Sequence, residues 1–337
     1  MNYRDRKMIK KQRDIQLLES SLEAKIGKSF PTLDSDPDVL QQLLEDKRSP
    51  NTRREYEKDI RKFFQVMSEC EPTQDKVLEF LHLEQHQAVM VCFKYKALLI
   101  KSGLKESTVN RRLAGIKALA RKGRQLGVCN FTLEDVQGEK VHTYRDTTGV
   151  SVNVFAEVLK LCDRTSEKGV RDYALLRLLW SGALRRSEVS RANIADFDNT
   201  NQQLRILGKG NGTQYQTVDL GSATAKAIAD YLQVRGKVKK SDPLFTSVDF
   251  CNKGHRLTGD GISKILKKYC KQAGITKPMS PHRVRHSSIT AALDATDGNI
   301  RKVQKLSRHS DPKTLMIYDD NRQKAQKEIS DILDSLI

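Results

Sequence analysis

Apolar side chains recur every three to four positions from residue 49 onward, which is the spacing of one face of an α-helix. The first of these helices carries Tyr56, Ile60, Phe63, Phe64 and Met67. The same spacing continues in residues 77–83 and 88–101 and, after the break at Gly103, in residues 109–120. The pattern predicts a small all-helical domain over residues 49–136.

The second half of the chain combines helical spacing with two short strand-like segments. Residues 173–180 are so densely apolar that we expect a helix buried on most sides. Residues 204–207 and 214–220 flank a glycine-rich stretch whose Asn-Gly dipeptide favours a hairpin turn. Further helices are expected at residues 152–163, 223–235, 261–273, 285–296 and 300–308. Residues 150–320 are therefore predicted to form a mainly α domain with a small antiparallel β-sheet.

Three segments lie outside these two domains. Residues 1–48 form a charged N-terminal arm to which we assign no function. Residues 137–149 are polar and lack periodicity, which is typical of an interdomain linker. Residues 321–337 predict an amphipathic C-terminal helix, which either packs on its own domain or docks on a neighbouring protomer.

Length and composition narrow the class of protein. A chain of 337 residues exceeds one usual core, so two domains are expected. No apolar run reaches the roughly 18 residues of a membrane helix, and the charged start lacks the apolar region of a signal peptide. The six cysteines are scattered without a CxxC pair, as in reduced cytosolic proteins. We expect a cytoplasmic protein with no membrane partner.

Positive charge is segregated along the chain. The formal net charge is +18, and residues 101–125 hold eight basic residues and one acid. Residues 261–293 hold seven basic residues and no acid. A charged surface that served only solubility would mix both signs, so nucleic acid is the favoured partner and an anionic membrane surface ranks well behind. The candidate DNA-binding residues are Lys105, Arg111, Arg112, Lys117, Arg121, Lys122, Lys264, Lys267 and Lys268.

Several residues of the second domain do not follow the core pattern. They are Arg185, Lys209 in Gly208-Lys209-Gly210, His282 and Arg285 in one turn, His309, and Tyr318 nine residues later. Each has an ordinary explanation by itself, such as an Arg185–Glu188 pair or a solvated turn lysine. His282 and His286 have the spacing of a zinc helix, but no HExxH glutamate and no carboxylate or cysteine ligand lies nearby, so no metal is expected.

In this order the residues resemble the tyrosine recombinase (phage integrase) family, including its Xer-type members. The family pattern is Arg-x-x-Glu, a hairpin lysine, His-x-x-Arg, a later histidine or tryptophan, and a tyrosine about nine residues on. The resemblance covers residues 150–320 by motif and about 50–135 as the family's helical core-binding domain. Ser307-Arg308 stands before His309 where Leu-Gly is usual, Ser-Gly-Ala-Leu precedes Arg185, and the hairpin lacks a common second lysine.

The resemblance implies DNA strand cleavage and rejoining through a 3′-phosphotyrosyl intermediate, without metal, ATP or another cofactor. Arg185 and Arg285 would clamp the phosphate, because guanidinium forks bind two oxygens at once. Tyr318 would be the nucleophile and Lys209 the general acid. His282 would exchange protons with Tyr318, and His309 would hydrogen-bond the phosphate. Glu188 is interpreted as structural.

The resemblance also implies double-stranded DNA as the partner and a homotetramer on paired DNA sites. It further implies a cytoplasmic, nucleoid-associated enzyme that integrates, excises or resolves DNA. A type IB topoisomerase and a catalytically silent DNA-binding member of the family remain alternatives. Tyr215 and Tyr269 are the next candidates for the nucleophile, and Arg186 is the alternative to Arg185.

Overall fold

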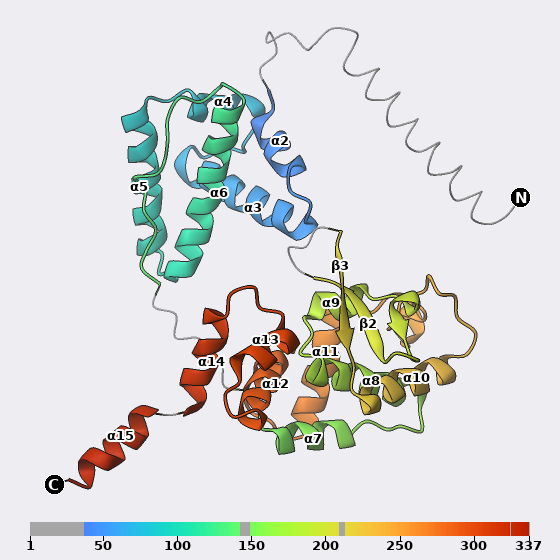
Figure 1. Cartoon of the computed structure of the whole chain (residues 1–337). Coiled ribbons are helices and arrows are strands. Elements are labelled where there is room, and N and C mark those ends of the chain that lie inside the picture. The colour runs from blue at the N-terminus through green and yellow to red at the C-terminus, as the bar shows by residue number, and fades with distance from the viewer. Residues whose placement is uncertain (1–36, 142–148, 209–212, 324, 337) are drawn as a thin grey trace, which may run out of the picture. The chain divides into compact units, whose positions relative to one another are not determined.

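The computed structural model describes residues 37–141, 149–208, 213–323 and 325–336. The chain divides into two units, Met1–His142 and Thr143–Ile337. In Figure 1, helices α2 to α6 belong to the first unit, and the elements from α7 to the C-terminus belong to the second. Each unit is described below by itself.

The first unit is built from helices alone within its described residues. They are α2 (Val39–Glu45), α3 (Pro50–Met67), α4 (Gln74–Leu81), α5 (Gln85–Lys101) and α6 (Glu106–Gln125). Helix α3 begins where the sequence predicts, because the Ser49 hydroxyl accepts a hydrogen bond from the Thr52 amide and Pro50 occupies the first turn. The core of the first unit is rich in aromatic residues. The Phe63 ring packs edge to face against the rings of Phe80 and Tyr95, with ring centroids 5.1 Å apart in both pairs.

Helix α2 corrects the boundary that we placed at residue 49. Val39 and Leu43 are buried in the same core as Ile60 and Leu113, and α2 lies against α6. A short helix with two buried apolar residues gains more from this core than it would in a free arm. Residues 39–45 therefore belong to the helical domain, and the remaining arm residues up to 36 lie outside the described chain.

The start of the expected linker also packs on the first unit. The Asn110 side chain forms hydrogen bonds with both backbone groups of Glu139. It donates to the Glu139 carbonyl at 2.8 Å and accepts from the Glu139 amide at 2.7 Å. Lys96 Nζ bonds to the Gln137 carbonyl at 2.9 Å and to the Glu139 carboxylate at 2.6 Å. Polar composition identified the segment as a loop but did not reveal these backbone contacts. Residues 142–148 of the linker are outside the described chain.

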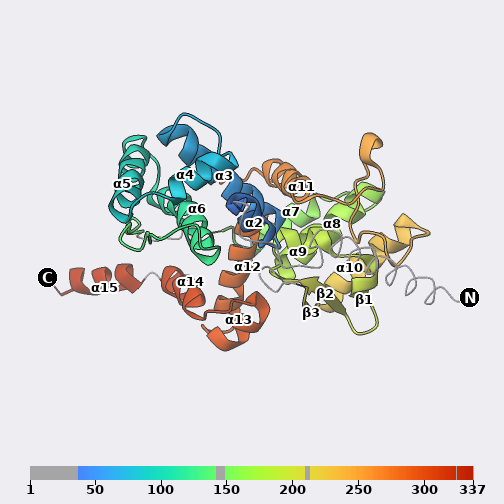
Figure 2. The same ribbon diagram turned by 90° about the horizontal axis from the view of Figure 1, so that it is seen from above.

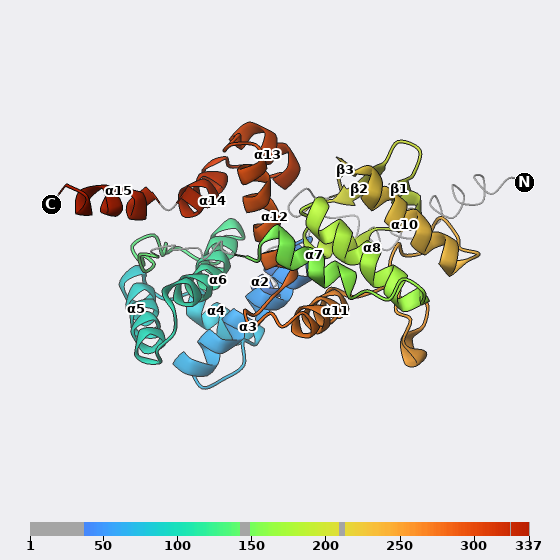
Figure 3. The same ribbon diagram turned by 90° about the horizontal axis from the view of Figure 1, so that it is seen from below.

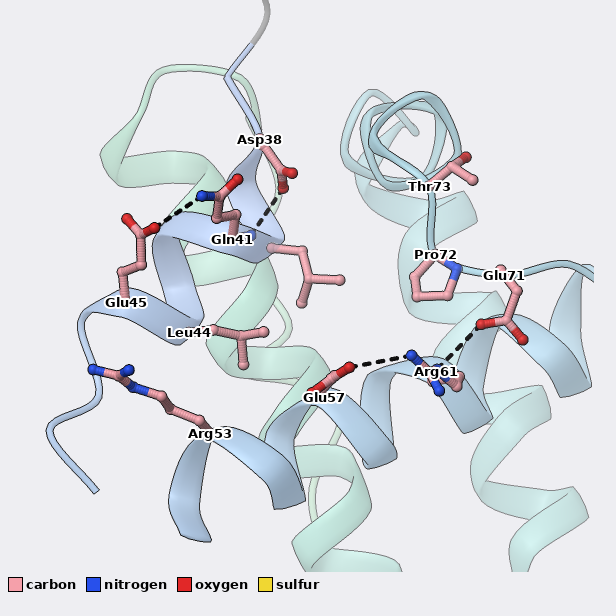
Figure 4. Close-up of a pocket in the computed structure, with 11 residues that line it drawn as sticks. Asp38, Gln41, Leu44, Glu45, Arg53, Glu57, Arg61, Glu71, Pro72 and Thr73 are labelled. Atoms are coloured by element: carbon pink, nitrogen blue, oxygen red, sulfur yellow. Dashed lines mark hydrogen bonds and ion pairs between the residues drawn. The ribbon is translucent and has the colours of Figure 1, made fainter. Parts of the chain in front are cut away.

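One hollow of the first unit lies between α2, α3 and the start of α4 (Figure 4). Arg61 bridges Glu57 and Glu71 there, with both N–O distances 3.1 Å. Asp38 and Glu45 add two further carboxylates to the lining. A hollow lined by four carboxylates and two arginines does not suit a phosphate backbone.

The second unit combines helices with a three-stranded antiparallel sheet. Strands β1 (Phe197–Asp198), β2 (Gln203–Leu207) and β3 (Tyr215–Asp219) pair in that order, with Leu204 opposite Val218. Strand β2 packs against α9, and the sheet lies beside α10 in Figures 2 and 3. The helices are α7 (Val152–Lys160), α8 (Glu167–Ser181), α9 (Arg186–Arg191), α10 (Ser222–Arg235), α11 (Gly259–Gln272), α12 (Pro281–Ala295), α13 (Ile300–Ser307), α14 (Lys313–Gln323) and α15 (Ala325–Asp334), with 3-10 turns at Ile194–Asp196 and Phe250–Asn252.

Helix α8 is the centre of this unit, as its dense apolar run predicts. Leu175, Leu176, Leu178 and Leu179 have no exposed surface. Helices α10 and α12 pack against it. The fold class predicted from the sequence, mainly α with a small antiparallel sheet, is confirmed.

Helices α12, α13 and α14 pack against one another (Figure 3). Helix α12 begins at Pro281, and the Ser280 hydroxyl accepts a hydrogen bond from the Arg283 amide at its N-terminus. Ile289, Leu293, Val303 and Leu315 form a small separate core between these three helices. Residues on the inward faces of all three helices are therefore brought together, although 26 positions separate Ile289 from Leu315 in the chain.

Candidate active site

Arg185 occupies the N-cap position of the short helix α9, directly after the buried residues Ala183 and Leu184. Its Nη1 lies 2.8 Å from Glu188 Oε1, and its backbone N–H donates to Glu188 Oε2 at 2.8 Å. The Glu188 side chain has no exposed surface, whereas that of Arg185 is 29% exposed. Glu188 therefore orients Arg185, while part of the guanidinium still faces solvent.

Arg186 is not the residue that Glu188 orients. Its Nη1 lies 2.9 Å from Asp260 and 3.3 Å from the Ser263 hydroxyl, both at the start of α11. The register proposed from the sequence, with Arg185 as the inward arginine, agrees with these contacts.

Arg285 lies in the second turn of α12 and is 1% exposed. Its guanidinium donates to the backbone carbonyls of Ala183 and Ser307, and its Nη2 is 3.2 Å from His309 Nε2. Burial, followed by the nearby charges of Arg185 and Arg308, lowers the pKa of Arg285 to about 10. An anion bound beside this guanidinium would offset the cost of burying its charge.

Tyr318 on α14 is 3% exposed and packs in the small core of α12, α13 and α14. Its hydroxyl is hydrogen bonded to Nδ1 of the buried His286. The His309 ring lies 6.2 Å from the Tyr318 ring, centroid to centroid. The structure thus brings Arg285, His309 and Tyr318 together.

His286 had no role in the sequence interpretation, which assigned proton exchange with Tyr318 to His282. His282 is exposed and packs its ring edge-on against His286, with centroids 4.2 Å apart. The two histidines lie one helical turn apart on one face of α12. Their i, i+4 spacing was the available signal, but only the tertiary structure shows that His286 meets the tyrosine.

Arg308 is a second residue that the motif did not identify. It ends α13 in the left-handed conformation, with φ of 54°. Its guanidinium contacts Glu188 Oε2 at 3.2 Å and the carbonyls of Gly182 and Leu306 at 3.2 and 2.7 Å. Burial lowers its pKa. Arg185 and Arg308 therefore both pair with the buried Glu188 carboxylate.

A polar pocket opens over this cluster. It is lined by Arg185, Gly208, Gln216, Gln304, Lys305, Arg308, His309, Ser310, Asp311 and Thr314. Gly208 and Gln216 belong to the β2–β3 hairpin. Lys209, the predicted general acid, lies in residues 209–212 and is outside the described chain.

The charge of this site is suited to a phosphodiester. The guanidinium groups of Arg185, Arg285 and Arg308 lie near the single buried carboxylate of Glu188, and a bound phosphate would balance the excess of positive charge. The Tyr318 hydroxyl, bonded to His286, lies in the same cluster.

Comparisons with known proteins agree with this geometry. Residues 151–325 match the phage integrase family, and residues 40–122 match the N-terminal SAM-like domain of phage integrases. The chain belongs to the phage integrase family of tyrosine recombinases.

Two relatives of the recombinase are similar over nearly their whole length. A tyrosine recombinase of Synechocystis sp. is 48% identical over 89% of this chain and 95% of the relative. A tyrosine recombinase of Synechococcus elongatus is 47% identical over 90% of this chain and 94% of the relative. The enzyme is therefore a tyrosine recombinase, and the topoisomerase alternative is not supported.

Among solved structures, the fold of the recombinase is similar to that of the XerH site-specific recombinase bound to palindromic difH substrate. The TM-score is 0.61 at 18% identity, over 88% of this chain and 84% of XerH. None of the helices in the described part of the recombinase is long and apolar enough to cross a membrane.

The two alternative tyrosines of the recombinase occupy different surroundings. Tyr269 is buried and donates a hydrogen bond of 3.0 Å to Asp172, which is also paired with the buried Arg171 at 2.6 Å. Burial and the Asp172 charge raise the pKa of Tyr269, so its hydroxyl does not ionise readily. Tyr215 lies exposed on β3, with its ring 5.5 Å from the Arg205 guanidinium carbon.

The basic residues predicted to bind DNA divide into two groups. In α6, Arg111 pairs with Glu55 and Asp59, Lys122 pairs with Asp46 at 2.7 Å, and the half-buried Arg112 lies beside Tyr95. Arg111 and Lys122 therefore have intramolecular ion-pair partners that the one-sided basic pattern did not reveal. The remaining predicted residues are Lys105, Lys117 and Arg121 in the first unit and Lys264, Lys267 and Lys268 on α11.

Within the described chain, none of these six remaining residues forms an ion pair. Lys105 and Arg121 are exposed in the first unit. Lys264, Lys267 and Lys268 are exposed on one side of α11, and Lys268 lies over the Tyr269 ring at 4.7 Å. Their positions on the molecular surface are compatible with phosphate contacts.

Proposed function

We propose that the recombinase cleaves one DNA strand by attack of the Tyr318 hydroxyl on a phosphodiester held by Arg185 and Arg285. The observation that carries this proposal is the buried hydrogen bond between Tyr318 and His286 beside the arginine cluster. The new bond joins the tyrosine oxygen to phosphorus, and the bond from phosphorus to the 5′ oxygen breaks. The product is a 3′-phosphotyrosyl link and a 5′-hydroxyl.

Charge stabilisation in this reaction falls to the guanidinium groups. A phosphodiester under attack accumulates negative charge on its non-bridging oxygens, and fixed donors there lower the barrier. Arg285 is held in place by two backbone carbonyls, and His309 lies within hydrogen-bond distance of it. Such anchoring supports a clamp whose geometry is set before DNA arrives.

Proton transfer is assigned to three residues. His286 Nδ1, when unprotonated, accepts the hydrogen of the Tyr318 hydroxyl and is placed to take it during attack. His282, in contact with His286, is a second proton carrier on the same helix. Lys209 is proposed to protonate the leaving 5′ oxygen, a role that rests on its motif and on the hairpin position of the adjacent Gly208 at the pocket.

Replacement of Tyr318 by phenylalanine tests the proposal. Covalent protein–DNA adducts should disappear, while noncovalent binding measured by gel shift stays nearly unchanged. Tyr269→Phe is the matched control and should retain adducts in whatever fraction remains folded. Adducts at the wild-type level in Tyr318→Phe would assign the nucleophile elsewhere, and absence of adducts from the wild-type protein on its cognate site would indicate a silent member.

We further propose that the active assembly is a homotetramer on paired DNA sites. Ile329, Ile332, Leu333 and Leu336 of the C-terminal segment are each more than half exposed in the single chain. An apolar helical face of this kind gains free energy by docking on a neighbouring protomer, and head-to-tail docking closes a ring. The recombinase is proposed to act in the cytoplasm in association with the nucleoid.

Removal of residues 328–337 tests the assembly. Single-site DNA binding should be largely retained, while paired-site complexes and strand exchange should be lost. Light scattering on DNA-bound protein measures the assembly. A truncated protein that still forms the full paired-site complex would show that this segment packs on its own chain.

A further inference from the structure

Arg308 occupies a backbone position that is unfavourable for its residue type. At the end of α13 it adopts φ of 54° and ψ of 36°, the left-handed region in which glycine is preferred. A residue with a Cβ is disfavoured there unless its side chain makes compensating contacts. Those contacts all lie at the active site.

The contacts of Arg308 converge on the segment before α9. Its Nη1 donates to the Gly182 carbonyl at 3.2 Å, and its Nη2 lies 3.4 Å from the Ala183 carbonyl. The Ala183 carbonyl also accepts from Arg285, and Ala183 itself has φ of 44°. Arg308 thus helps to hold a strained residue whose carbonyl anchors one of the two proposed clamp arginines.

Arg308 also shares the carboxylate that orients the other clamp arginine. Glu188 Oε1 accepts from the Arg185 guanidinium, while Oε2 lies 3.2 Å from Arg308 Nη2. The Glu188 side chain is fully buried, so its charge requires a cationic partner at all times. If Arg185 were the only cationic partner of Glu188, the attraction of Arg185 to Glu188 would compete with its attraction to a phosphate.

We propose that Arg308 is a positioning residue that neutralises Glu188, so that Arg185 is available to the scissile phosphate. Through the Ala183 carbonyl it also fixes the segment that anchors Arg285. This inference rests on the proposed roles of Arg185, Arg285 and Tyr318. Arg308 is thus a third guanidinium at the proposed active site, and it acts through Glu188 and not by contacting DNA.

The first test is Arg308→Gly. Glycine suits the left-handed backbone, so this variant removes the guanidinium without adding strain. Covalent adduct formation should slow by about 10- to 100-fold, the usual effect of losing an outer partner of a site residue. Noncovalent DNA binding should stay within about twofold of wild type, because Arg308 is not a DNA contact in this proposal. Arg301→Ala, at an exposed arginine on the same helix, is the matched control and should keep its cleavage rate.

A second substitution separates positioning from a merely structural role. In Arg308→Gly, the Glu188 carboxylate depends on Arg185 alone, so Glu188→Gln in that background removes the competing charge. The double variant should cleave faster than Arg308→Gly, although Glu188→Gln alone should be slower than wild type. Arg308→Lys, which keeps the charge near Glu188, should recover part of the rate.

The outcomes distinguish this inference from the proposed function. A double variant that is as slow as Arg308→Gly or slower overturns the neutralising role. Normal cleavage by Arg308→Gly overturns it as well, while the roles of Tyr318 and the clamp arginines stand. Adducts that persist in Tyr318→Phe contradict the proposed nucleophile itself, whatever Arg308→Gly does.

Discussion

Basic residues of this recombinase are used in two different ways in its two units. On α6 of the first unit, Arg111 and Lys122 pair with carboxylates of their own domain, and exposed residues such as Arg121 stand apart from any acid. In the second unit, Arg285 is almost fully buried and bonds to backbone carbonyls. The side chains have the same formal charge, but they differ in burial and in the partners that they contact.

The physical reason for the difference is solvent. An exposed cation is screened by water and salt, so it adds a modest and salt-dependent attraction to DNA. A buried guanidinium is desolvated, which lowers its pKa and strengthens its attraction to any anion that enters the site. The first unit is therefore suited to adding affinity, and the second to lowering a barrier.

The largest effect that this comparison predicts concerns Arg285→Lys. Lysine keeps the charge but loses the fork that binds two carbonyls and faces the phosphate, so cleavage should fall by at least about 100-fold. Arg121→Lys, the matched change at an exposed site of α6, should leave the rate nearly unchanged. Single-turnover cleavage of a nicked site measures both. Equal losses in the two variants would contradict the division between the units.

The next prediction concerns the salt dependence of DNA binding. With about six phosphate contacts the log–log slope should be near −5 or steeper, since each contact contributes about −0.9. Replacing Lys105 and Arg121 with glutamine should make the slope shallower by about 1.8, whereas replacing Arg111 and Lys122 should change it by less than about 0.5, because both are already paired. Fluorescence anisotropy over a salt series decides it. Similar changes in the two double variants would mean that the ion pairs open when DNA binds.

Anion binding to the free protein tests the buried cluster. At a sulfate concentration ten times its dissociation constant, binding should add about 1.4 kcal/mol, which corresponds to about 3–6 °C in the Tm of the second unit. Arg185→Gln should lose most of this specific increment while keeping the general stabilisation by sulfate that both proteins share. Differential scanning fluorimetry with sulfate measures the difference. An equal shift in both proteins would remove Arg185 from the anion site.

The smallest expected effect comes from Asp46→Asn, which releases Lys122. The salt slope should become steeper by at most about 0.9, because one more cation can meet a phosphate. The hydrogen bond from Lys122 lowers the pKa of Asp46, so the pair persists above pH 3.8 and is lost only as the pH falls through the lowered value. Gel shifts at two salt concentrations near neutral pH measure the change. A slope unchanged from wild type would show that Lys122 does not reach DNA.

Much of the second unit could be read from the sequence because its signals are local. The apolar run of α8, the Asn-Gly hairpin and the ordered motif from Arg185 to Tyr318 each depend on neighbouring residues and their spacing. The boundary at residue 49 was misplaced because α2 has only 7 residues, too few to show a helical repeat, so its burial became visible only in the packed core. The pairing of Arg111 with Asp59 was missed for a similar reason, since 52 positions separate the two residues.

By itself, the amino-acid sequence determined the helical periodicity, the excess of positive charge and the identity of the chemical groups at the proposed site. Only the tertiary structure decided which groups meet. The Tyr318 hydroxyl forms its hydrogen bond with His286 and not with His282, the residue that the motif indicated. Arg308 contacts Glu188, although 120 positions separate the two residues in the chain. Local spacing sets which face of a helix a side chain occupies, but contacts between helices depend on how their faces pack, and burial then sets the strength of each charge.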